Sequence, residues 1–364
     1  MALIGGVSIM KGNIITLTFS DLKKGMIIAQ NIEQNSRVLL KKDMIITDPI
    51  IKKLKNLMFV GNVKVYWNES LEKNLTLKEK ELEEFNKIEN KFNEISSKLI
   101  NTFRNMEEDN NQCISEIREF SNKIQNELNP SSIIIKNIVI HGSGDDSIYR
   151  HGVNVAALSA LIGKWIGFDN KKLNLLIYSA ILHDFGKTKI NKEILVKKST
   201  LTSSEYKIIR NHSVLGYNTI SKVPFIDKSV SYGVLMHHER EDGSGYPLGL
   251  KSEGIHPFGK LIAIADVFDA INSNRGYKRK KAPFEALQIV KNESLGKLNY
   301  EYVKIFLEHI INYYLGEEAI LNSGEKCKIL QMNINNLEKP LVLKDGEFVD
   351  LDEHKELYIK ELLL

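Results

Sequence analysis

Apolar and polar residues alternate in short stretches over roughly the first 70 positions of the chain. Residues 14–18 read Ile-Ile-Thr-Leu-Thr and residues 63–66 read Val-Lys-Val-Tyr, and a period near two predicts strands with one buried face. Between these stretches, residues 49–57 carry apolar side chains at helical spacing. We therefore expect residues 1–72 to form a small β-rich domain that contains one helix.

The pattern becomes helical after residue 75. Apolar side chains recur at spacings of three or four, or sums of these, and the residues between them are largely Glu, Lys and Asn. The apolar stripe consists of Leu82, Phe85, Phe92, Ile95, Leu99 and Phe103. We expect an amphipathic helical connector over residues 73–130. It either packs on its own domain, or transmits a signal, or forms a homodimer.

Residues 131–320 have mainly helical periodicity, and residues 321–364 return to strand-like stretches. A capping-box sequence, Thr202 to Glu205, opens one of the expected helices. Asp345-Gly346 between two apolar stretches predicts a hairpin. Helices are expected over residues 153–165, 173–182, 203–212, 259–272 and 302–315. The expected fold class is mainly α: an all-helical domain, preceded by a small β-rich (α+β) domain and followed by a short β-like segment.

Length and charge narrow the class of protein. A chain of 364 residues is too long for one compact core, so at least two domains are expected. Hydrophobic residues make up 43% and charged residues 26%, which is typical of a globular protein in water. The net charge of +4 is small for this length and does not favour a protein that binds nucleic acid polymers.

Cysteine usage and hydropathy indicate a cytoplasmic protein. The two cysteines, Cys113 and Cys327, lie in unrelated segments, which excludes a disulfide framework and a cysteine-rich zinc site. No apolar run reaches membrane-spanning length, so membrane insertion is not expected. Residues 3–10 are apolar but contain two glycines and follow no basic stretch, so we do not expect a signal peptide.

Potential metal ligands are concentrated between residues 151 and 266. Five of the chain's nine histidines and two aspartates in this stretch are the candidates: His151, His183, Asp184, His212, His237, His238 and Asp266. Neutral imidazoles together with a carboxylate that can bridge two ions are the ligand set of a site for two divalent metals. An ordinary core or a solvated surface gives no reason for this concentration.

The surroundings of the ligands strengthen the metal hypothesis. His183 and Asp184 close an apolar helix, and adjacent helical residues point about 100° apart, so the pair can address two ions. Asp266 directly follows the apolar run 261–265, where burial of an unpaired carboxylate would cost on the order of several kcal/mol. A histidine pair at the end of an apolar run, His237 and His238, seldom serves packing.

Three sequence motifs around these ligands resemble the HD-GYP family of metal-dependent phosphohydrolases. They are His-Asp-Phe-Gly-Lys at 183–187, the segment 237–247 ending in Gly-Tyr-Pro, and Ala-Asp-Val-Phe-Asp-Ala-Ile at 265–271. The resemblance implies an all-helical HD-type catalytic domain over residues 131–320. It also implies that Asp184 bridges two ions, with His151, His183 and Asp266 on one and His212, His237 and His238 on the other. This mixed nitrogen and oxygen shell favours iron or manganese over magnesium.

The same resemblance implies roles at the substrate. The family's named activity is hydrolysis of cyclic di-GMP, for which Asp184, Lys187 and Asp269 are the candidate catalytic residues. Lys187 would contact the phosphate, while Asp269 would orient a ligand or protonate the leaving oxygen. Candidate substrate-binding residues are Lys187, Tyr246, Arg275 and Lys278. The Gly-Tyr-Pro loop either braces the histidine pair or contacts substrate, and it is a candidate surface for protein partners.

The extent of hydrolysis is predicted from one absent ligand. Some members of the family hold a third metal with a glutamate four residues before the first histidine, and here that position is Ser147. Serine is a poor replacement for a carboxylate ligand. We therefore expect a metal-activated water to open the ring to linear pGpG, with slow or no conversion to GMP. The alternatives are a signalling module that binds a nucleotide or a partner without turnover, and a phosphodiesterase for another cyclic dinucleotide such as cyclic GMP-AMP.

Overall fold

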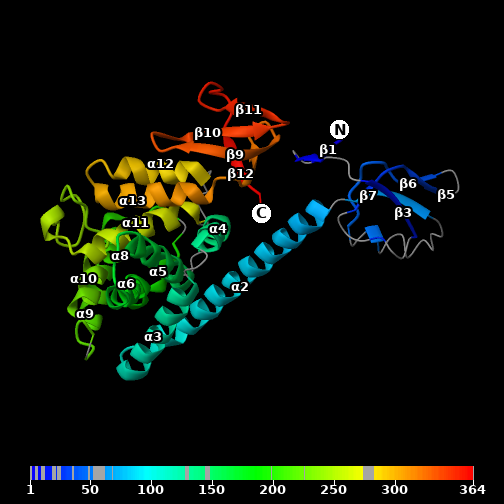
Figure 1. The fold of residues 1–364 in the computed structure, drawn as a ribbon. Helices are drawn as coiled ribbons and strands as arrows, with labels where there is room; N and C mark the ends of the chain where they lie inside the picture. The colour runs from blue at the N-terminus through cyan, green and yellow to red at the C-terminus, as the bar shows by residue number, and fades with distance from the viewer. Residues whose placement is uncertain are drawn as a thin grey trace. The chain divides into compact units, whose positions relative to one another are not determined.

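Strands lie at both ends of the chain and helices occupy its middle, as the residue pattern predicts (Figure 1). The computed structural model describes all residues except 1, 5–6, 10–12, 19–21, 23–25, 35–36, 48–49, 52–61, 68, 128–130, 144–147, 198, 225, 274–282 and 364. The mainly α fold class with flanking β segments is confirmed. No helix among the described residues is both long enough and apolar enough to cross a membrane.

The chain divides into two compact units, one of residues 1–84 and 343–348 and the other of residues 85–342 and 349–364. In the first unit, β7 (Asn62–Trp67) is the central strand between β3 (Asn13–Thr18) and β4 (Ile27–Ile28), and both pairings are antiparallel. Val63 and Val65 are buried and Lys64 is exposed, so the alternation seen in the sequence sets the buried face.

Two short strand pairs complete the described part of the first unit. They are β1 (Ala2–Ile4) with β2 (Val7–Ile9), and β5 (Ile32–Gln34) with β6 (Arg37–Leu40). The helix expected over residues 49–57 falls largely outside the described residues.

The connector is two helices, where the sequence pattern suggested one. Helix α2 (Glu69–Asn105) ends at a turn, and α3 (Asn110–Glu127) follows it. The Asp109 carboxylate accepts a hydrogen bond from the backbone N–H of Gln112, which caps the new helix. The apolar stripe from Phe85 to Phe103 is buried in the same core as the helices that follow, but Leu82 is 50% exposed.

The helical middle of the chain contains all the candidate ligands. Helix α5 packs against α6 and α11, while α10 packs against α6, α9 and α11. The bounds are α4 (Ser131–His141), α5 (Ile148–Trp165), α6 (Asn170–Leu182), η2 (Phe185–Lys189), α7 (Lys192–Leu195), α8 (Ser203–Arg210), α9 (His212–Ile220), α10 (Lys228–Met236), η3 (Ser252–Gly254), α11 (Pro257–Asn272), α12 (Pro283–Glu293), α13 (Tyr300–Ile310) and η4 (Ile311–Tyr313).

One helix boundary differs from the expectation in a way that matters for the site. The capping box of Thr202 and Glu205 is present, but α8 ends at Arg210, and His212 opens α9 instead of closing α8. The reason is a close approach of two backbones. A Cβ atom built on Gly186 would lie 1.9 Å from the carbonyl oxygen of His212, so only glycine lets η2 and the start of α9 meet.

The C-terminal strands form a five-stranded sheet in the order β11-β10-β9-β8-β12. The predicted hairpin is confirmed: Asp345 and Gly346, with φ of 51° and 88°, connect β10 to β11. The strands are β8 (Glu318–Leu321), β9 (Lys326–Asn333), β10 (Asn336–Lys344), β11 (Glu347–Asp350) and β12 (Ile359–Leu362).

Candidate metal centre

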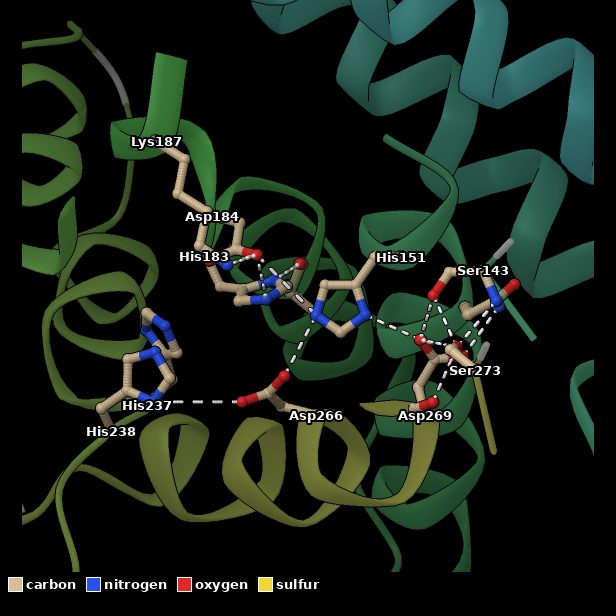
Figure 2. A network of polar contacts seen from close by, with 12 residues as sticks. Ser143, His151, His183, Asp184, Lys187, His237, His238, Asp266, Asp269 and Ser273 are labelled. Carbon is tan, nitrogen blue, oxygen red and sulfur yellow. Dashed lines mark hydrogen bonds and ion pairs between the residues drawn. The ribbon is translucent and has the colours of Figure 1, made fainter. Parts of the chain in front are cut away.

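The seven candidate ligands come from helices that are distant in sequence and lie close together. All of them except His212 are labelled in Figure 2. His183 is the C-cap of α6 and Asp184 begins the turn into η2. His237 is the C-cap of α10. His151 and Asp266 lie within α5 and α11. Helix ends are where a side chain can leave the core while the apolar body of the helix stays packed.

The ligand atoms form two groups, each with all its atoms within 4.8 Å of one another. One group is His151, His183 and Asp266, and the other is Asp184, His212, His237 and His238. The family resemblance divides the other six ligands in the same way but shares Asp184 between both ions, and the assignment of these residues to metals stays a prediction.

The Asp184 carboxylate faces both groups. Its Oδ1 atom is 3.4 Å from Nε2 of His212 in one group. Its Oδ2 atom is 3.5 Å from Nε2 of His183 and 3.7 Å from Nε2 of His151 in the other. A carboxylate with one oxygen directed at each group can bridge two cations.

Backbone hydrogen bonds set the tautomer of three histidines. The Nδ1 atoms of His183, His212 and His237 each lie 2.7 Å from the carbonyl oxygen three residues earlier in the chain. A carbonyl only accepts, so each Nδ1 carries the proton and donates it, which leaves Nε2 with a free lone pair.

Two observations show that these residues fit a metal. The Nε2 atom of His183 and Oδ1 of Asp184 are buried and make no hydrogen bond within the described residues. The Nε2 atoms of His212 and His237 lie 3.2 Å apart, although both are acceptors in the tautomers just described. Buried acceptors without donors are costly, and divalent cations are the ligands that satisfy such a cluster.

Burial and nearby charges set the protonation states in the group of Asp184, His212, His237 and His238. Burial lowers the pKa of His212 to about 4, against the attraction of Asp184. Burial and neighbouring histidines hold the pKa of His237 well below its usual value. Burial would raise the pKa of Asp184, but the positive charge of Lys187 and the contact with His183 hold it well below its ordinary range. At neutral pH these side chains are therefore in the protonation states that ligate metals.

His151 behaves differently because it lies between two carboxylates. Its Nε2 atom is 3.0 Å from Oδ1 of Asp266, and its Nδ1 atom is 2.7 Å from Oδ2 of Asp269. Burial opposes the charge on the imidazole, but the hydrogen bonds to the two carboxylates outweigh it and raise the pKa of His151 to about 9. A cation that binds this group has to displace a proton.

The other predicted site residues have distinct places. Lys187 extends from η2, and its Nζ atom is 2.6 Å from Oδ2 of Asp184. Asp269 is fully buried and contacts His151, Asn154 and Ser143. Arg275 and Lys278 lie outside the described residues, as does Ser147.

Tyr246 stacks on the histidine pair. Its ring centroid is 4.5 Å from that of His238, at an interplanar angle of 25°. The guanidinium of Arg210 lies 4.2 Å from the centroid of Tyr246. Burial raises the pKa of the Tyr246 hydroxyl, so the group stays a hydrogen-bond donor.

The Gly-Tyr-Pro loop is held by a buried carboxylate that the sequence reasoning missed. Glu239 accepts hydrogen bonds from the backbone N–H groups of Leu248 at 2.7 Å and Leu250 at 2.9 Å. At Gly245 a Cβ atom would lie 2.4 Å from the backbone nitrogen of Arg240, so the loop folds tightly back on its own start. These contacts brace the loop directly after His238.

Arg150, Asn154 and Arg210 were also missed. Arg150 and Asn154 could have been noticed as two strongly polar side chains, four residues apart, in an otherwise apolar helix. Arg210 has no sequence signal, because its role depends on the fold of the loop that carries Tyr246.

Comparison with known proteins shows what the domain around this site is similar to. Residues 132–299 match the HD domain family. A cyclic di-GMP phosphodiesterase of Thermotoga maritima is 38% identical over 167 residues, which are 45% of this chain and 45% of that protein. One from Pseudomonas aeruginosa is 30% identical over 200 residues, covering 55% and 48%. The 3'3'-cGAMP-specific phosphodiesterase 1 of Vibrio cholerae is 34% identical over 167 residues, covering 46% and 38%.

Over residues 132–299 the chain is similar to HD domains, and the relatives that match this part of the chain are named as cyclic dinucleotide phosphodiesterases. The chain spans about half or less of the length of these curated relatives.

Proposed function

We propose that this protein is a metal-dependent phosphodiesterase that hydrolyses cyclic di-GMP to linear pGpG. The observation that carries the proposal is the Asp184 carboxylate, which directs one oxygen to each of two ligand groups. The buried Nε2 atom of His183 in one of these groups has no hydrogen-bond partner among the described residues. Two similar proteins are named cyclic di-GMP phosphodiesterases, which supports cyclic di-GMP as the substrate.

The seven ligands would hold two divalent ions, for which iron or manganese suits the mixture of imidazole and carboxylate. When bound, such ions lower the pKa of water so that a nucleophile exists at neutral pH.

The chain's own residues would position the phosphate. Lys187 is half-buried beside Asp184, where its ammonium can donate to a phosphate oxygen. Tyr246 and Arg210 lie on the other side of His238 and offer a hydroxyl donor and a guanidinium. Asp269 is enclosed by His151, Asn154 and Ser143, so it orients the imidazole of His151 and does not protonate the leaving oxygen. Arg275 and Lys278 are proposed to bind the rest of the nucleotide.

The test is product analysis with protein purified without oxygen and assayed for bound metals. Wild-type protein should convert cyclic di-GMP to pGpG, with GMP appearing slowly or not at all, and Asp184→Asn should be inactive. If iron is bound, exposure to air should lower activity. Turnover by Asp184→Asn, or binding of cyclic di-GMP by the metal-loaded protein without any product, would refute the proposal.

A second candidate substrate is 3'3'-cGAMP, because one similar protein is named a 3'3'-cGAMP-specific phosphodiesterase. Competition between the two cyclic dinucleotides in one reaction decides between them. The substrate with the higher kcat/KM is consumed first.

A further inference from the structure

Arg150 is a buried arginine directly before the candidate ligand His151. It is 6% exposed, and its guanidinium lies 5.3 Å from the ring centroid of Phe92 in helix α2. A buried guanidinium costs several kcal/mol unless its donors are paired, on the order of the desolvation penalty of one ion. The hydrogen-bond acceptors of the Arg150 guanidinium therefore show which residues hold this side chain in place.

All five N–H donors of the guanidinium have an acceptor. Nη1 donates to Glu89 at 3.2 Å and Asn93 at 2.5 Å, while Nη2 donates to Glu89 at 2.7 Å and Asn137 at 2.8 Å. Nε donates to Asn154 at 3.0 Å. Glu89 and Asn93 belong to α2, Asn137 to α4 and Asn154 to α5, so one side chain joins three helices.

The network continues to the metal centre. The Asn154 amide accepts from Arg150 through Oδ1 and donates through Nδ2 to Oδ1 of Asp269 at 2.8 Å. The other carboxylate oxygen of Asp269 lies 2.7 Å from Nδ1 of His151. Arg150, Asn154, Asp269 and His151 are all buried, so no exposed side chain interrupts the path after Glu89.

The consequence is mechanical as well as electrostatic. If α2 moves and withdraws the Glu89 carboxylate, the guanidinium is left buried without its counter-charge, which is strongly unfavourable. The arrangement can relax only by moving Arg150 and the Asn154 amide that holds Asp269. Because Asp269 orients the imidazole of His151, the geometry of one ligand group follows the position of α2.

We propose that Arg150 is a positioning residue that couples helix α2 to the metal affinity of the group formed by His151, His183 and Asp266. The coupling regulates the site in the proposed function, on which this inference rests. Helix α2 directly follows the N-terminal β-rich segment in the chain, so a change in that segment could reach the metal centre through α2.

The test measures metal binding without substrate. Mn²⁺ is titrated calorimetrically into metal-free full-length protein, and the two binding steps are compared among wild type, Arg150→Lys, Glu89→Gln and the double variant. Loss of an outer partner of a metal-ligating histidine weakens metal binding by about 10–100-fold. In both single variants we expect the Mn²⁺ affinity to fall by this factor at one of the two binding steps. The double variant should bind Mn²⁺ no more weakly than Arg150→Lys does.

A matched control separates coupling from general destabilisation. Lys136 neighbours Asn137 in α4, but its Nζ atom pairs with Glu317 at 2.6 Å, outside the network. Lys136→Met should lower the melting temperature and leave both Mn²⁺ affinities unchanged. If Arg150→Lys does not fold, Glu89→Gln decides, since its side chain keeps the shape of glutamate.

Unchanged Mn²⁺ affinities in Glu89→Gln, or equal weakening of both steps, would overturn the coupling. Absence of hydrolysis by the Mn²⁺-loaded wild type would instead refute the proposed function. The two failures are distinguishable, because the titration contains no cyclic dinucleotide.

Discussion

The Nε2 atoms of His212 and His237 lie 3.2 Å apart, and the Nδ1–H of each imidazole donates a hydrogen bond to a backbone carbonyl. Two lone pairs therefore face one another in a buried site. A cation between them removes this unfavourable contact and makes metal binding part of the stability of the fold.

Metal removal should lower the melting temperature. An ion that binds only the folded state stabilises it by about 2.7 kcal/mol when its free concentration is one hundred times its Kd. Differential scanning fluorimetry with Mn²⁺ and then with a chelator measures the effect. In Asp184→Asn the chelator should change the melting temperature far less, and an equal shift in both proteins would contradict a site built around Asp184.

Gly186→Ala should damage both stability and metal binding. The new Cβ atom would lie 1.9 Å from the His212 carbonyl and 2.7 Å from the Gly216 backbone nitrogen, and backbone atoms cannot move aside cheaply. Overpacking of this kind costs about 1–3 kcal/mol. Gly254→Ala is the control, because its Cβ would meet only the Leu250 side chain, at 3.4 Å. Normal Mn²⁺ binding by Gly186→Ala would show that His212 does not need this close approach.

The two ligand groups should respond differently to pH. In metal-free protein the pKa of His151 is about 9, so a cation at its group competes with a proton, and affinity should rise about tenfold per pH unit between pH 7 and 9. The pKa of His212 is about 4, so proton competition at that residue is absent above pH 5. Calorimetric Mn²⁺ titrations at several pH values test this. Equal pH slopes for both binding steps would contradict it.

The same shift predicts a pH dependence of stability without metal. The folded-state pKa of His151 is above its unfolded value, so its stabilising contribution is complete below pH 6.5 and disappears as pH rises through 9. Metal-free wild type should therefore lose more stability between pH 7 and 9 than His151→Gln does. Urea denaturation at each pH gives the comparison.

Tyr246→Ala should lower kcat/KM about tenfold, because the stack on His238 and the contact with Arg210 are lost together. An aromatic stack is worth about 0.5–1.5 kcal/mol, which corresponds to a factor of up to about ten. Tyr246→Phe keeps the ring and distinguishes two roles. If the Tyr246 ring only braces His238, Tyr246→Phe should have nearly normal kinetics. If the hydroxyl contacts substrate, Tyr246→Phe should have a raised KM.

Local patterns were sufficient to predict the division of the chain into strands and helices. Alternation at 63–66 and the stripe from Phe85 to Phe103 are direct consequences of one buried face, and their outcomes agree with the structure. The turn at Asp109, which separates α2 from α3, was missed, because a stripe continues in register across a short turn.

The sequence by itself determined which side chains can ligate metals, since that depends on their chemistry and on the helices that carry them. Only the tertiary structure decided that Asp184 faces both groups, that Asp269 is enclosed behind His151, and that Arg150 joins three helices. The physical reason is that these relationships join residues up to 118 positions apart. Their distances are set by how helices pack, which no local periodicity encodes.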